Sequence, residues 1–82
     1  MAGPEDTCGP RDEIVAKAAA VFGEMIVNRA VTAEGGMIEV LASPSGSYTI
    51  IITGASKKPY MSCVAMSGED WRTIEAEWGD RL

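Results

Sequence analysis

The side chains of this sequence that could do chemistry are two cysteines, Cys8 and Cys63, and twelve carboxylates. Histidine is absent, which removes the usual general base near neutral pH, the histidine-dependent nucleophile triads and the commonest zinc ligand. Two cysteines are too few for a four-cysteine zinc site, and these are too far apart for a Cys-x-x-Cys redox centre. They leave two interpretations, a disulfide or a pair of buried thiols.

The disulfide is the favoured interpretation. Closing a loop of this length stabilises a fold by about 4 kcal/mol in the chain-entropy model, a large share of the stability of a small domain. We expect the bond to join the segment ahead of the first helix to the last strand, and so to hold the helix layer against the sheet layer.

The carboxylates are better explained by helix ends and solvated surface than by catalysis. The Ser-Gly-Glu-Asp segment at 67–70 has the pattern that caps a helix start, which accounts for Glu69 and Asp70. Asp12 and Glu13 suit the positive end of a helix dipole and lack the ligand spacing of a calcium loop. We therefore predict no catalytic residue, no metal site and no cofactor, and a protein that is not an enzyme.

Length and charge narrow the classes of protein further. A chain of 82 residues gives one domain. Seven basic against twelve acidic side chains, a net charge of −5, oppose binding to a phosphate backbone, so we expect no nucleic-acid partner. The longest apolar runs are far shorter than a membrane span requires.

The pattern along the chain predicts a tail over 1–9 and a single α+β domain over 10–82. Pro10 suits the start of a helix and Gly23 its end. From Gly23 onward the apolar period changes toward two, which predicts four strands at about 25–31, 37–43, 47–54 and 60–66, joined as an antiparallel meander. Turns are expected at 34–36 and 44–46, where glycine supplies a positive φ.

Alternation within these strands predicts which face meets the first helix. Ile38, Val40 and Ala42 share a face of the second strand, and Tyr48, Ile50 and Ile52 share a face of the third. We expect both faces to be buried against the helix, and a bond to Cys8 would place Cys63 on the same side.

A short second helix is expected over 69–78, with an aromatic and aliphatic stripe along one side. Trp78 stands near the end of the chain, where little remains to cover it. We predict an interaction surface made of Ile74, Trp78 and Leu82. The fold class expected is thus α+β, an N-terminal helix packed on a four-stranded antiparallel meander, followed by a short C-terminal helix.

A series of short motifs also carries a family resemblance: Cys8, Phe22-Gly23-Glu24, Ile38-Glu39-Val40, Ser45-Gly46-Ser47-Tyr48-Thr49, Ser62-Cys63-Val64-Ala65 and Gly68-Glu69-Asp70-Trp71. The series resembles a family of small exported bacterial proteins, mostly uncharacterised, and covers about residues 8–71. The resemblance implies a periplasmic or surface location, a bond between Cys8 and Cys63, and no catalytic residue. This chain departs from the family in having Phe22 for tyrosine, Tyr48 for tryptophan, and Lys57-Lys58-Pro59 for a Pro-Asp-Gly-like turn.

Two functions follow as hypotheses. The first is a non-enzymatic, disulfide-stapled domain that binds an unidentified protein or has a structural role, periplasmic or secreted after removal of a leader. The alternative is a cytoplasmic acidic inhibitor, with a phage origin open, that binds a basic groove on a host protein. The strand over 25–31 is the expected sheet edge, through which two copies could pair as a homodimer.

Overall fold

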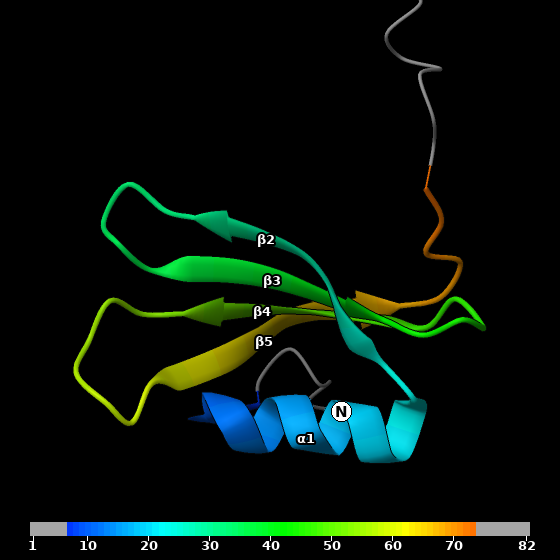
Figure 1. The fold of residues 1–82 in the computed structure, drawn as a ribbon, viewed down its shortest axis with the longest axis horizontal. Helices are drawn as coiled ribbons and strands as arrows, with labels where there is room; N and C mark the ends of the chain where they lie inside the picture. Colours follow the sequence, from blue (N-terminus) through cyan, green and yellow to red (C-terminus); the bar gives the residue numbers. More distant parts are fainter. Residues whose placement is uncertain (1–6, 74–82) are drawn as a thin grey trace, which may run out of the picture.

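One helix lies across one face of a five-stranded antiparallel sheet (Figure 1). The structure, a computed structural model, describes residues 7–73. Its elements in chain order are β1 (Cys8–Pro10), α1 (Arg11–Phe22), β2 (Met25–Val31), β3 (Met37–Ala42), β4 (Tyr48–Thr53) and β5 (Met61–Gly68). No helix among these elements is long and apolar enough to cross a membrane.

The ends of α1 follow from local chemistry. Pro10 occupies the N-cap position, and Asp12 and Glu13 lie in the first turn, where the helix dipole favours negative charge. Gly23 ends the helix at φ 67°, and its N–H and that of Glu24 donate to carbonyls of the last turns. The predicted limits of this helix are confirmed.

The predicted meander is present as β2, β3, β4 and β5, each paired antiparallel with the next. Gly35 and Gly46 have φ of 90° and 101° in the turns between them, as the sequence predicted. β2 lies at one end of the sheet order β1-β5-β4-β3-β2, which confirms it as an edge strand.

The expected fold class is wrong in the number of strands. Residues Cys8–Pro10, of which the sequence predicts all but Pro10 to be tail, form β1 and pair with β5, so the sheet has five strands. Val64 N–H donates to the Thr7 carbonyl at 2.8 Å, and Arg11 N–H donates to the Tyr60 carbonyl at 2.9 Å. A segment rich in glycine and proline has no strand propensity of its own, but β5 offers it a free edge.

The fold class is also wrong in its C-terminal helix. Residues 69–73 are irregular. Asp70 has φ 65°, which interrupts a right-handed helix. Trp71 N–H donates to the Gly46 carbonyl at 2.9 Å, and the Trp71 ring lies 5.7 Å from that of Tyr48. These contacts hold the chain against the turn after β3, and residues 74–78 of the expected helix lie outside the described residues.

The helix packs on the sheet face opposite to the one predicted. Ala18 forms the core with Leu41, Ile51 and Val64, and Ile14 and Val15 of α1 pack against these residues. The predicted buried residues Ile38 and Ile52 are instead 38% and 46% exposed. Alternation gave the correct pairs but could not choose between the faces, because both faces of β3 and β4 carry aliphatic side chains.

The turn between β2 and β3 depends on a glycine that has no room for a side chain. A Cβ at Gly36 would lie 2.6 Å from the Thr53 carbonyl oxygen. We therefore expect Gly36→Ala to lower the free energy of unfolding by about 2 kcal/mol through overpacking, measured by urea denaturation. Gly54→Ala is the matched control, because a Cβ there meets nothing within 4 Å. Equal stability of the two variants would contradict this account.

Candidate functional site

The sheet face turned away from α1 carries exposed apolar side chains, including Ile38 and Ile52, and we call it the apolar sheet face. Strand register places its residues in rows across the sheet: Ile38 pairs with Ile52, and Ile52 with Cys63. No described helix or strand covers it (Figure 1). Its aliphatic and sulfur-bearing members are Ala30, Ile38, Val40, Ile50, Ile52, Met61, Met66 and the two cysteines.

This face is apolar and uncharged over its central rows. Met61 and Met66 are each 49% exposed, and Ile38 and Ile52 are also partly exposed. No residue in the rows through Ile38 and Val40 carries a charge. Large exposed apolar surface of this kind is characteristic of sites where another molecule binds.

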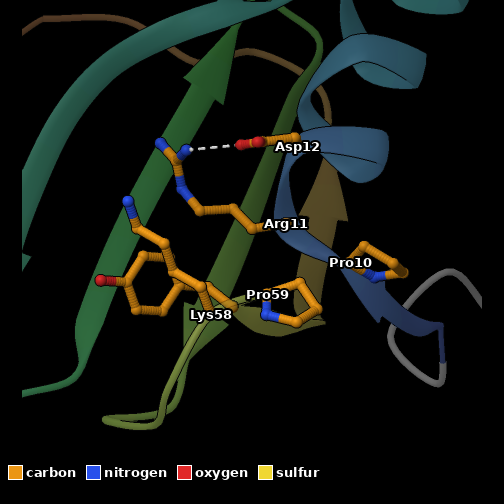
Figure 2. Close-up of a pocket in the computed structure, with 6 residues that line it drawn as sticks. Pro10, Arg11, Asp12, Lys58 and Pro59 are labelled. Carbon is orange, nitrogen blue, oxygen red and sulfur yellow. Dashed lines mark hydrogen bonds and ion pairs between the residues drawn. The ribbon is translucent and has the colours of Figure 1, made fainter.

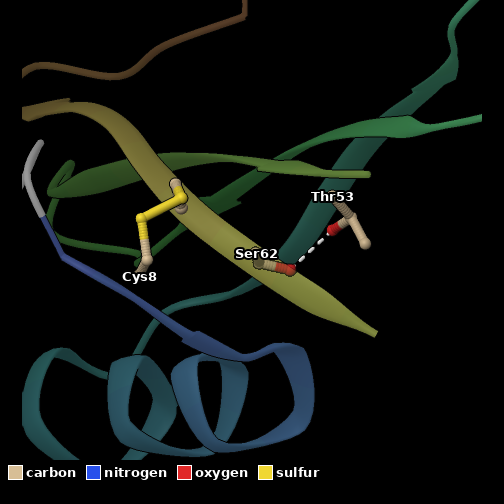
Figure 3. Close-up of a disulfide and its surroundings, with 4 residues drawn as sticks. Cys8, Thr53 and Ser62 are labelled. Carbon is tan, nitrogen blue, oxygen red and sulfur yellow. Dashed lines mark hydrogen bonds between the residues drawn. A yellow bond between two sulfur atoms is a disulfide. The ribbon is translucent and has the colours of Figure 1, made fainter. Parts of the chain in front are cut away.

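The disulfide between Cys8 and Cys63 is confirmed, and it lies on this same face. Figure 3 shows it joining β1 to β5. The hydrogen bond of 2.6 Å between the Thr53 and Ser62 hydroxyls, drawn in the same view, is buried on the other side of the sheet. The two cysteines are directly opposed partners in neighbouring strands, and both are exposed. The bond therefore links two strands of one sheet, and the predicted link between the helix layer and the sheet layer is wrong.

The helix-covered face holds a buried ionic cluster made of Glu39, Arg11 and Arg29. Glu39 Oε1 accepts from Arg11 Nε at 2.8 Å, and Oε2 accepts from Arg11 Nη2 at 2.7 Å. Arg29 Nε and Nη2 donate to Oε2 at 3.0 and 2.8 Å. The Glu39 side chain is fully buried, whereas those of Arg11 and Arg29 are 18% and 50% exposed.

The cluster fixes the charge state of Glu39. The hydrogen bonds from Arg11 lower the pKa of the Glu39 carboxyl, burial opposes this, and the hydrogen bonds from Arg29 lower it further. The same contact raises the pKa of Arg11. A carboxylate so fully paired is a structural group, since both of its oxygens already accept hydrogen bonds.

A cleft of about 600 Å³ opens between the start of α1 and the loop ahead of β5 (Figure 2). Pro10, Arg11, Lys58 and Pro59 are among the residues that line it. The dashed line in Figure 2 joins Arg11 to Asp12, at 3.2 Å. Arg11 is already bound to Asp12 and Glu39, so Lys58 is the lining cation that no ion pair among the described residues engages.

The remaining predicted site residues are placed as follows. Ile74, Trp78 and Leu82, the predicted interaction surface, lie outside the described residues. Within residues 7–73, no group of three or more cysteine, aspartate or glutamate side chains could hold a metal ion. Sequence reasoning missed Glu39, although a lone carboxylate between Ile38 and Val40 in a strand signals either an exposed face or a buried ion pair.

No protein-family model, curated protein or solved structure matches this chain.

Proposed function

We propose that this protein is a non-enzymatic, disulfide-stapled domain that acts outside the cytoplasm by binding another protein through the apolar sheet face. The observation that carries the proposal is the exposed apolar surface across β3, β4 and β5, opposite the helix. Its width, crossing several strands, suits a protein surface better than a small molecule, which would need a concave site.

The disulfide supports a location outside the cytoplasm. Disulfides persist in oxidising compartments and are rare in the reducing cytoplasm, and both sulfur atoms of this one belong to exposed residues that a cytoplasmic reductant could reach. The family resemblance of the motifs implies the same location. Together these favour the exported domain over the cytoplasmic inhibitor.

The charge of the chain favours a partner of a different kind over a second copy. Two copies would each carry −5 and would repel one another, whereas a partner with basic residues around an apolar patch would be attracted. Pairing of two copies through β2 stays a prediction, and it would use the edge of the sheet, not this face.

Photo-crosslinking in the native cell tests the proposal. We expect Ile52→p-benzoylphenylalanine to give a discrete adduct with another protein in the extracytoplasmic fraction. Adding Ile38→Thr should abolish that adduct, because Ile38 is the direct cross-strand neighbour of Ile52. The measurement is the adduct yield on a denaturing gel, with the captured protein identified by mass spectrometry.

Two controls make the result interpretable. Val21→p-benzoylphenylalanine places the probe on α1 at a residue that is 59% exposed, and it should give no such adduct. Val27→Thr in β2, also at an exposed residue, should leave the Ile52 adduct intact. Adducts only between copies of this chain, equal yields from both probe positions, or free thiols at both cysteines in the native cell would overturn the proposal.

A further inference from the structure

A second site lies on the helix-covered side, at the C-terminal end of α1, and it centres on Glu24. This residue is only 2% exposed and its Oε1 is buried, yet that oxygen has no hydrogen-bond partner among the described residues. Buried carboxylates are normally paired or hydrogen-bonded, as Glu39 is here. An unpaired one requires an explanation.

The position of Glu24 at the end of the helix favours a cation beside its carboxylate. It follows Gly23 directly at the end of α1, and its N–H donates to the Ala18 carbonyl at 3.2 Å. The C-terminal end of a helix dipole carries partial negative charge, which repels a carboxylate and attracts a cation. The last turn of α1 contains no basic side chain that could supply this charge.

Glu24 lines a cavity of about 250 Å³ that is rich in oxygen acceptors. The cavity lies between the end of α1 and the adjoining ends of β4 and β5, and Ser47, Thr49, Ser67 and Glu69 also line it. Register places Thr49 opposite Ser67. One buried carboxylate, a second carboxylate and the hydroxyls of Thr49 and Ser67 are acceptors of the kind that an N–H donor of positive charge requires. The Ser47 hydroxyl is already hydrogen-bonded to that of Ser43 at 2.8 Å.

The rest of the lining comes from Phe22, Tyr48 and Gly68. Phe22, the last residue of α1, lines the same cavity, and aromatic faces attract cations. A neighbouring cavity of about 210 Å³ shares Phe22 and Thr49 with it. Its other lining residues are the apolar Ile14, Ala18 and Val64 together with Thr7 and Lys17. Apolar surface therefore begins where the oxygen acceptors end, an arrangement that suits a charged head on an aliphatic stem.

We propose that this cavity binds a primary alkylammonium group, with the nitrogen donating to Glu24. The group could be the side chain of a lysine on a protein or a free aliphatic amine, which share this chemistry. A metal ion is disfavoured, because the described residues contain no cluster of three or more acidic or cysteine ligands. The site lies on the opposite side of the sheet from the apolar sheet face, so it does not depend on the proposed function.

The test is a titration of the oxidised 82-residue chain followed by amide chemical shifts. We expect n-butylammonium chloride to shift the signals of Ser47, Thr49 and Gly68 in a saturable way, and butan-1-ol, which has the same stem without the charge, to leave them unchanged. Nα-acetyl-lysine methylamide, used as a second probe, distinguishes the two sources: if it binds at least as well as butylammonium, the lysine side chain is indicated.

Glu24→Gln keeps the shape of the side chain and should weaken butylammonium binding at least about tenfold, the loss expected for one charge-assisted hydrogen bond. Glu34→Gln, an exposed change of the same charge outside the cavity, should leave binding unaltered. The comparison of butylammonium with butanol uses the unaltered protein, so it holds even if Glu24→Gln fails to fold. Equal shifts with butanol, no saturable shift, or shifts with calcium chloride alone would overturn the proposal.

Discussion

Replacing Arg11 with methionine is expected to lower the free energy of unfolding by about 3 kcal/mol. The change removes two hydrogen bonds of 2.8 and 2.7 Å to Glu39, and it leaves that carboxylate fully buried with Arg29 alone. Breaking a buried ion pair from one side is costly because the remaining charge keeps its desolvation penalty. Urea denaturation of the two proteins at neutral pH gives the difference.

A double variant separates this penalty from the net contribution of the pair. Arg11→Met/Glu39→Met removes the buried charge with its partner, so we expect it to be more stable than Arg11→Met alone. Arg72→Met is the control, since Arg72 is exposed and lies 4.0 Å from Asp70, and it should change the stability little. If the double variant is the least stable of the three, the cost lies in the lost packing of the side chains, and the ionic account is wrong.

The same cluster predicts a dependence on pH. The pKa of Glu39 is lower in the folded chain than its ordinary value of 4.5, first because Arg11 donates to it. At a pH above the ordinary pKa, the ionised Glu39 therefore contributes its full stabilisation to the folded state. This contribution is lost as the pH falls through the lower pKa of the folded chain. The difference in stability between the unaltered protein and Glu39→Gln should be full at neutral pH and shrink as the pH falls below 4.5.

The elements that the sequence predicted well are those with strong local signals. Gly23, Gly35 and Gly46 each have a positive φ where a helix end or a turn was expected. The aliphatic run of β4 and the alternation in β3 predicted both strands and their pairing. These features depend on backbone conformation and side-chain period, which neighbouring residues determine.

The features that failed depend on contacts distant in the sequence. β1 forms only because β5 presents an edge to Cys8–Pro10, and the expected helix from Glu69 fails at its start because Trp71 binds the turn at Gly46. Which face of the sheet α1 covers also depends on contacts between residues distant in the sequence. Glu39 lies on the helix-covered face because Arg11 reaches it from α1 and Arg29 from β2.

The candidate sites were predictable only in part. The pairing of Cys8 with Cys63 followed from their being the two cysteines, and it is confirmed. The cavity at Glu24 was not predicted, because burial of a carboxylate directly after a helix-ending glycine requires that β4 and β5 lie beneath the helix end. Its one local signal is the absence of a basic residue in the last turn of α1.

Removing the disulfide is expected to lower the free energy of unfolding by about 4 kcal/mol. The bond joins residues separated by 55 positions, and closing a loop of that length reduces the conformational entropy of the unfolded chain. For a domain of this size that corresponds to a fall of about 15 °C or more in the melting temperature. The measurement is thermal unfolding of the chain with and without reductant. Cys8→Ala/Cys63→Ala should melt at the reduced protein's temperature and should not respond to reductant.

Loss of the disulfide should destabilise β1 first, together with the ionic cluster at Glu39, because Arg11 of that cluster is the next residue after β1. Hydrogen exchange should accelerate most at the Val64 amide, which donates to Thr7, and at the Arg11 amide, which donates to Tyr60. With β1 detached, Arg11 is held less firmly against Glu39, so Arg11→Met should cost less in the cysteine-free chain than in the oxidised one. Equal costs in both chains would show that α1 alone positions Arg11, and that the disulfide holds only the outer strand.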